Sequence, residues 1–137
     1  MRGMTATLLV IGMMSPALAA EAPQSDIADL TAFADAFDAA QIAQDRAALD
    51  RMVADDLVFI DGWTGPDDDY DPVTLTDRVI LSLGKDAGLA SAEAILSGRA
   101  AGKPFRVRIR FTDIFRRHGD GWQASYIHVT RMPIGDD

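Results

Sequence analysis

The sequence contains no cysteine and only two histidines, which excludes several kinds of chemistry at the outset. Without cysteine there is no disulfide bond and no thiolate ligand or nucleophile, so the hydrophobic core alone has to hold the fold together. The two histidines, His118 and His128, do not have a spacing typical of zinc sites. Glycine-rich phosphate loops, dinucleotide-binding fingerprints and nucleophile-elbow motifs are also absent. We therefore expect no metal ion and no cofactor.

Positive charge is scarce as well, because 13 Lys and Arg stand against 21 Asp and Glu. An acidic protein is a poor partner for nucleic acid, whose phosphates attract cationic side chains. A local exception is the row formed by Arg106, Arg108 and Arg110. This row indicates an outward strand face whose arginines pair with neighbouring carboxylates, and the alternative is a surface that binds anions or a second subunit.

Long hydrophobic runs are missing except near the N-terminus, at residues 8–14. Arg2 precedes this run, and Pro16 and the small residues 17–19 follow it, a pattern typical of a secretory signal peptide. The run is too short to serve as a stable membrane span. We therefore expect a signal peptide at residues 1–20, cleaved just before Ala20 or Glu21, with an uncleaved membrane anchor as the alternative. Residues 21–137 are then a single domain in the periplasm or outside the cell, with no membrane contact.

The first part of the mature chain predicts two helices and a short strand. One long amphipathic helix is indicated by apolar residues at spacings of three and four, namely Ile27, Leu30, Phe33, Ala34, Phe37 and Ala40. Asp45 is a suitable cap for a second, shorter helix. The apolar run at residues 57–60 predicts a strand buried on both sides. The acidic loop at residues 62–72 lacks the spacing of a calcium site, so we expect it to be solvated.

Two hairpins follow. In the first, a turn centred on Lys85 and Asp86 would place Arg78 opposite Glu93 on the outer face. The same register directs two apolar pairs inward, Val79 with Ala92 and Leu81 with Ala90. In the second hairpin, which spans residues 105–131 and turns at Gly119 and Asp120, apolar residues alternate with arginine and threonine.

Helices followed by a meander of long strands predict an α+β fold, in which a curved antiparallel sheet wraps around the long N-terminal helix like a cone. Such a sheet leaves an opening at the end that the helix does not fill, and ligands usually bind in an opening of this kind.

Several short motifs occur in an order that is similar to one known family: Val53-Ala54-Asp55-Asp56-Leu57-Val58-Phe59-Ile60-Asp61-Gly62, Arg110-Phe111-Thr112-Asp113-Ile114-Phe115, Asp120-Gly121-Trp122-Gln123 and His128-Val129-Thr130. The chain resembles the nuclear transport factor 2-like superfamily, and within it the small SnoaL-like proteins of unknown function, many of them exported by bacteria. The resemblance implies the cystatin-like cone but no particular activity, because this fold hosts enzymes, binding proteins and assembly modules. Relatives usually have a further helix where this chain has the loop at residues 62–72.

Asp113 is the one polar residue on the inward face of the strand that begins at residue 105. Ketosteroid isomerase, an enzyme of the superfamily that resembles this chain, combines an Asp base with a Tyr and a protonated Asp that stabilise an oxyanion. The resemblance implies Asp61 as the base and Asp113 as the protonated acid, both catalytic. It also places Phe37 near the position of the tyrosine, so one expected hydrogen-bond donor is missing.

A hairpin symmetric about its turn places Asp113 opposite Tyr126, Phe111 opposite His128 and Phe115 opposite Ala124. The polar groups would then share one cluster inside an apolar cavity, where burial raises the pKa of the Asp113 carboxyl. We expect the ligand-binding residues to be Phe37, Trp63, Phe111, Tyr126 and His128. The alternative is a purely structural cluster, in which Tyr126 and His128 satisfy the buried carboxyl.

Three functions are open at this point. The first is an exported binding or accessory protein whose cavity holds a small apolar molecule. The second is an isomerase or lyase that uses Asp61 and Asp113. The third is a homodimeric interaction module that makes contact through the convex face of the sheet, with Arg108, Arg110 and Ile127.

Overall fold

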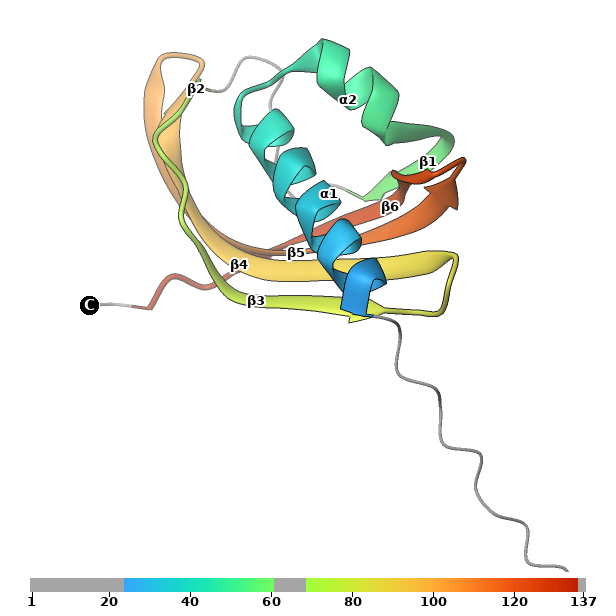
Figure 1. Cartoon of the computed structure of the whole chain (residues 1–137). Coiled ribbons are helices and arrows are strands. Elements are labelled where there is room, and N and C mark those ends of the chain that lie inside the picture. Colours follow the sequence, from blue (N-terminus) through green and yellow to red (C-terminus); the bar gives the residue numbers. More distant parts are fainter. Residues whose placement is uncertain (1–23, 61–68, 136–137) are drawn as a thin grey trace, which may run out of the picture.

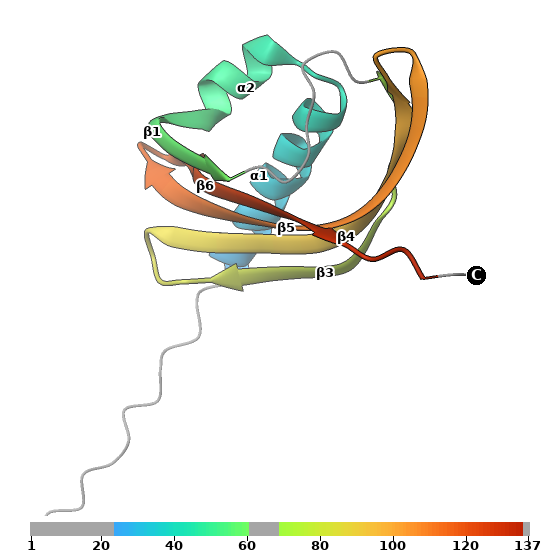
Figure 2. The same ribbon diagram turned by 180° about the vertical axis from the view of Figure 1, so that it is seen from behind.

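The structure is a computed structural model that describes residues 24–60 and 69–135. Within these residues the chain forms two helices and one curved sheet, and the sheet wraps around the first helix (Figure 1, Figure 2). The predicted α+β architecture is therefore confirmed. The elements, in chain order, are α1 (Gln24–Ile42), α2 (Arg46–Met52), β1 (Val53–Ile60), β2 (Asp69–Tyr70), β3 (Leu75–Ser82), β4 (Ala87–Ala100), β5 (Lys103–His118) and β6 (Gly121–Met132).

Helix α1 lies across the concave face of the sheet and buries the predicted stripe, with Leu30, Ala34, Phe37 and Ala40 almost fully covered. At its far end the chain turns into α2, whose first turn is capped as expected. The Asp45 carboxylate accepts a hydrogen bond from the Ala48 amide at 3.0 Å. Both helices are thus set by local sequence signals together with the apolar stripe of α1.

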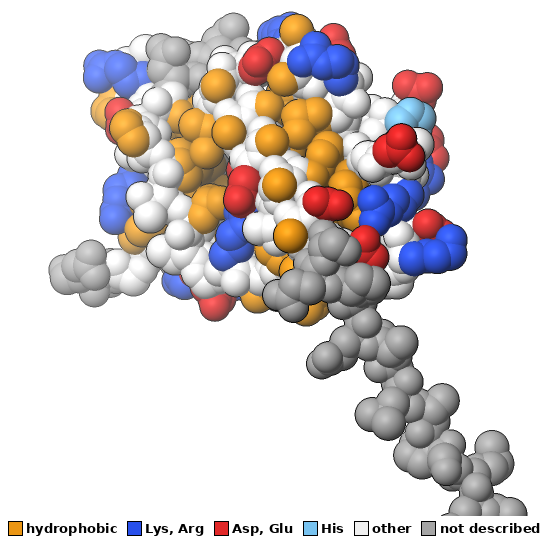
Figure 3. Space-filling model, viewed as in Figure 1, with side chains coloured by type: hydrophobic (Ala, Val, Ile, Leu, Met, Phe, Trp, Pro, Cys, Tyr) orange, Lys and Arg blue, Asp and Glu red, His pale blue; other side chains and the backbone are white. Residues whose placement is uncertain are grey.

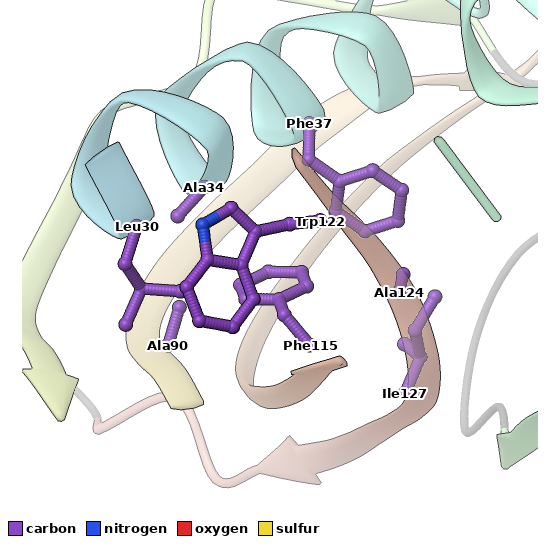
Figure 4. Packing of buried hydrophobic residues seen from close by; sticks show 8 residues of the cluster. All are labelled: Leu30, Ala34, Phe37, Ala90, Phe115, Trp122, Ala124 and Ile127. Carbon is purple, nitrogen blue, oxygen red and sulfur yellow. The ribbon is translucent and has the colours of Figure 1, made fainter. Parts of the chain in front are cut away.

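A packed core lies between α1 and one end of the sheet (Figure 4). Phe37 of α1 meets Phe115 of β5 edge to face, with ring centres 5.8 Å apart. Gly88 of β4 permits this close approach, because a Cβ atom there would lie 2.4 Å from a methyl carbon of Leu30. The core therefore depends on one small residue in the sheet as well as on large ones in the helix. Its buried members are Leu30, Ala34, Phe37, Ala90, Phe115, Trp122, Ala124 and Ile127.

The sheet has the order β1-β6-β5-β4-β2, and β3 also pairs with β4. Strands β4, β5 and β6 form the long antiparallel meander, whereas β1 runs parallel to β6 at the edge. The expectation that residues 57–60 are buried on both sides is wrong. At the edge of the sheet the last three residues of β1 stay about half exposed, at 51%, 47% and 46% for Val58, Phe59 and Ile60.

The predicted register of the β3–β4 hairpin is also wrong, by one residue. Val79 pairs with Ser91 and Leu81 with Leu89, so both face outward, and Ile80 takes the inward place beside the core. Beyond Val79 a bulge shifts the register again, and Asp77 there has a left-handed φ of 51°. The bulge brings Arg78 to the concave side, where it contacts α1.

Candidate functional site

A cavity of about 330 Å³ opens on the concave side of the sheet, beyond the end of the packed core. Hydrophobic side chains gather around a hollow beside α1 in the space-filling view (Figure 3). The volume lies within the range of small-molecule sites, and a mostly apolar lining with a few polar groups is typical of them. Its apolar walls include Leu75, Ala94, Leu96, Ile109, Phe111 and Val129, and its polar residues are Asp38, Gln41, Gln44, Arg46, Tyr70 and Asp113.

Asp113 lies in the wall of this cavity, between Ala90 of β4 and Ile127 of β6. Only 1% of the residue is exposed, and neither carboxyl oxygen has a hydrogen-bond partner among the described residues. The pKa of Asp113 is raised to about 8, mainly by desolvation; the charge of Asp38 adds to the rise and the charge of Arg78 opposes it. The predicted rise of this pKa is confirmed in direction, and the carboxyl holds its proton at neutral pH.

Next to Asp113 lies an ion-pair cluster that sequence reasoning missed. Arg78 Nη1 donates to Asp38 Oδ2 at 2.5 Å, and Arg78 Nη2 lies 2.9 Å from Asp35 Oδ1. Asp38 is 8% exposed, and its pKa is raised, first by burial and against the effect of Arg78. A signal was available: Asp38 directly follows the buried Phe37, at the border of the apolar stripe, and Arg78 interrupts an apolar strand.

The predicted cluster of Asp113 with Tyr126 and His128 does not form. Phe115 pairs with Ala124 as expected, but a bulge at Ser125 then shifts the register by one residue. Asp113 therefore pairs with Ile127, while Tyr126 pairs with Ile114 on the convex face, with His128 two residues further along that face. The two rings contact each other there, 6.3 Å apart. The bulge is favoured because it buries Ile127 instead of two polar rings.

The other predicted site residues have different outcomes. Phe111 lies in the cavity wall, whereas Phe37 packs in the core against Phe115 and is not among the lining residues that the structure describes. Asp61 and Trp63 lie outside the described residues, so their roles stay predictions. Phe59, which was not predicted as a site residue, lines the cavity from the edge strand.

Two of the three arginines in the row on the convex face, Arg108 and Arg110, pair with carboxylates as the sequence indicated. Arg108 contacts Glu93, and Arg110 contacts both Glu93 and Asp77. The Arg108 guanidinium lowers the pKa of Glu93. The arginines of these pairs are partly exposed to solvent, so the pairs give the outer face its charge pattern and contribute little to stability.

The cavity thus combines apolar walls with one protonated, unpaired carboxyl. A neutral carboxylic acid of this kind can donate a hydrogen bond to a bound molecule or exchange its proton with solvent. Among residues 24–60 and 69–135, no cluster of His, Asp or Glu is arranged to hold a metal ion, and no helix is long and apolar enough to cross a membrane.

Comparison with solved structures assigns the fold. An NTF2-like protein of unknown function in nutrient uptake from Rhodospirillum rubrum is similar over 77% of this chain and 99% of its own, with a TM-score of 0.68 and 26% identity. The chain belongs to the NTF2-like superfamily. A ketosteroid isomerase-like protein from Erwinia carotovora atroseptica matches this NTF2-like chain over 82% of its length and 100% of that protein's, with a TM-score of 0.66 and 16% identity.

A third similar structure is described as a Ca/calmodulin-dependent kinase II association domain, from Exiguobacterium sibiricum. It covers 85% of the NTF2-like chain and 100% of its own, with a TM-score of 0.71 and 15% identity. No protein-family model matches this sequence, and neither does any curated protein. At identities this low, the likenesses to the isomerase-like protein and to the association domain concern the fold alone.

Proposed function

We propose that this protein binds a small, largely apolar molecule in the cavity of its cone, as an exported binding or accessory protein. One observation carries the proposal: an apolar cavity of about 330 Å³ whose wall contains a buried carboxyl without a partner among the described residues. Buried polar groups in folded proteins nearly always have a hydrogen-bond partner. A ligand with a polar group would provide that partner, and its apolar part would fill the remaining volume.

The proposal is tested by native mass spectrometry of the protein purified from its own periplasm, followed by thermal shift assays with a panel of apolar compounds. We expect a co-purified small molecule, or a compound that raises the melting temperature. Ala94→Phe fills the cavity from β4 and should abolish binding, whereas Ala47→Leu, on the exposed face of α2, should not. No retained molecule, together with an unchanged melting temperature across the panel, would overturn the proposal.

N-terminal sequencing of the same material tests the cleavage before Ala20 or Glu21.

The catalytic alternative keeps Asp113 as the acid and Asp61 as the base of an isomerase or lyase. The raised pKa of Asp113 supports the acid role, because a protonated carboxyl can donate to a developing oxyanion. If this alternative holds, the wild type should exchange the acidic α-hydrogens of a cyclic ketone for deuterium, and Asp61→Asn should lose this activity. An exchange rate in the wild type equal to that without protein would count against it.

A homodimeric interaction module is the second candidate, and the convex face supports it. Strand register aligns a continuous apolar row across that face, which consists of Leu81, Leu89, Ile114, Tyr126 and Val58. Leu81 and Val58 are half exposed, at 50% and 51%. Exposed apolar patches of this kind commonly mark protein interfaces. The expected contribution of Ile127 is wrong, because that side chain is buried in the core.

The dimer is tested by multi-angle light scattering. We expect a dimer whose dissociation is promoted by Leu81→Asp in the apolar row, and not by Ile134→Asp near the C-terminus, where a hydrophobic residue is also exposed. A wild-type monomer at high concentration would exclude the dimer.

A further inference from the structure

Two carboxyl side chains, Asp38 and Asp113, line the cavity close to each other. The nearby guanidinium of Arg78 pairs with Asp38 and with the exposed Asp35, which is not among the described lining residues. Arg78 Nη1 donates to Asp38, and Nη2 lies 2.9 Å from Asp35 without forming a hydrogen bond; Nη2 and Nε have no hydrogen-bond partner among the described residues. Among the described residues Asp113 forms no ion pair, although the charge of Arg78 acts on it, and its neighbours on β4 and β6, Ala90 and Ile127, carry no charge. Two further titratable groups line the cavity, Tyr70 and the exposed Arg46.

We propose, resting on the proposed function, that the ligand of this cavity is a protonated primary or secondary amine with an apolar body, whose ammonium group pairs with the Asp113 carboxylate beside Asp38. The amine supplies a cation in direct contact with Asp113, and its N–H groups provide partners for both carboxyl oxygens. Hydrogen bonds between an ammonium and a carboxylate are stronger than neutral ones. The body of the ligand then lies along the apolar walls formed by β4, β5 and β6.

Other head groups fit this end of the cavity less well. A carboxylate or phosphate would add negative charge next to Asp38 and Asp113, in a protein whose formal net charge is already −8. A neutral alcohol can hydrogen-bond to the protonated Asp113 but brings no compensating charge. A cation turns this buried carboxyl into an ion pair, and the pairing offsets the cost of removing the Asp113 proton.

Amine binding is coupled to the release of one proton. In the free protein the Asp113 carboxyl holds a proton, because its pKa is about 8. When the ammonium ion binds, this proton leaves for solvent and the carboxylate remains as the partner of the cation. Below pH 8 the affinity for the amine therefore rises with pH, by about tenfold between pH 6 and pH 7. The affinity for the matching alcohol stays flat over the same range, because no proton is exchanged.

The experiment is isothermal titration calorimetry with sets of three compounds that share a body and differ only in the head group. One set is 3-phenylpropylamine, 3-phenyl-1-propanol and 3-phenylpropionate, and further sets have cyclic and linear alkyl bodies. Titrations in phosphate and in HEPES, which differ in ionisation enthalpy and contain no primary or secondary amine, measure proton release directly. At pH 7.5 we expect the amine to bind at least tenfold more tightly than the alcohol and to release about three-quarters of a proton. We expect the carboxylate to bind weakest.

Asp113→Asn should remove both the preference for the amine and the proton release, while alcohol binding persists. Asp86→Asn makes the same change in the exposed β3–β4 turn and should leave all three affinities unchanged. Equal binding of amine and alcohol, or amine binding without proton release, would overturn the inference and leave the proposed function standing. Failure of every compound with every head group would contradict the proposed function itself.

Discussion

The concave face of the sheet has two halves that share the same strands but differ in what covers them. In the first half α1 packs on Phe115, Trp122 and their neighbours, and the side chains are closely packed. In the second half Ala94, Leu96, Ile109 and Phe111 form an equally apolar surface that borders the cavity. Helix α1 covers only one half of the longer sheet. The end of that covered half is therefore where the packed core ends and the cavity begins.

Strand β5 runs through both halves, and Asp113 lies at their boundary. Phe115, two residues on, belongs to the packed core, and Phe111, two residues back, belongs to the cavity wall. A carboxyl in the packed half would have no room for a partner. At the boundary Asp113 is desolvated and lies next to a volume that a ligand can fill.

The largest effect is expected from truncating the packed half. Phe115→Ala should lower the free energy of unfolding by about 4 kcal/mol, because the cavity it leaves is closed in on all sides. Phe111→Ala removes the same ring from the open half and should cost about half as much, since that ring already borders a cavity. Urea denaturation measures both. Equal losses for the two variants would remove the distinction between the halves.

The second prediction concerns pH. The folded protein holds the Asp113 proton up to a pKa of about 8, whereas an Asp carboxyl in the unfolded chain releases it near pH 3.9. The folded state thus binds one more proton between these values, so the stability that Asp113 contributes is full at low pH and is lost as pH rises. Between pH 5 and pH 7 this contribution falls by about 1.4 kcal/mol per pH unit.

Asp113→Asn removes this contribution. The free energy of unfolding of Asp113→Asn minus that of the wild type should therefore increase by about 3 kcal/mol from pH 5 to pH 7. Asp86→Asn, in the exposed turn, serves as the control. A constant difference between wild type and Asp113→Asn over this range would show that the boundary carboxyl is not desolvated.

A smaller loss is expected when the cation at the boundary is removed. Arg78→Met leaves the buried Asp38 without its partner and should cost about 2 kcal/mol at pH 7, less than for a fully buried pair because the arginine is partly exposed. The pKa of Asp113 should rise further, since Arg78 holds it down. Urea denaturation gives the first quantity and NMR titration of the carboxyl gives the second. An unchanged pKa would place Arg78 outside the electrostatics of the site.

The smallest effect is expected on the convex face. Arg110→Met breaks partly exposed ion pairs with Glu93 and Asp77, and should lower the free energy of unfolding by less than about 1 kcal/mol. If Arg110→Met loses as much free energy of unfolding as Arg78→Met, ion pairs on the convex face contribute as much to stability as those on the concave face, which would contradict this prediction.

The fold was predictable because its signals are local and repeated. The stripe of α1, the Asp45 cap and the alternation in β5 each point to one structure, and together they define the cone. Registers were not predictable to the residue. In β3 the run Val79, Ile80, Leu81 is apolar on both faces, so alternation cannot choose between them.

Part of the candidate site was predictable for the same reason. Asp113 is visible in the sequence because it interrupts a strict alternation of apolar residues, and its raised pKa follows from burial alone. Its neighbours are not visible, because Asp38 and Arg78 meet it through a helix crossing and a bulge that depend on three-dimensional packing. Tyr126 and His128 were assigned to the wrong face because one extra residue in β6 changes the pairing.

That extra residue, Ser125, has a consequence for chain length. It forms the bulge together with Tyr126, where these two residues stand opposite Ile114 alone, and its hydroxyl donates to the Ile114 carbonyl at 3.2 Å. Removing it would make the ladder regular, with Ala124 still opposite Phe115 and Ile127 still opposite Asp113. We therefore expect that Ser125 can be deleted from the β5–β6 hairpin and that the same side chains will still form the core, the cavity wall and the outer apolar row.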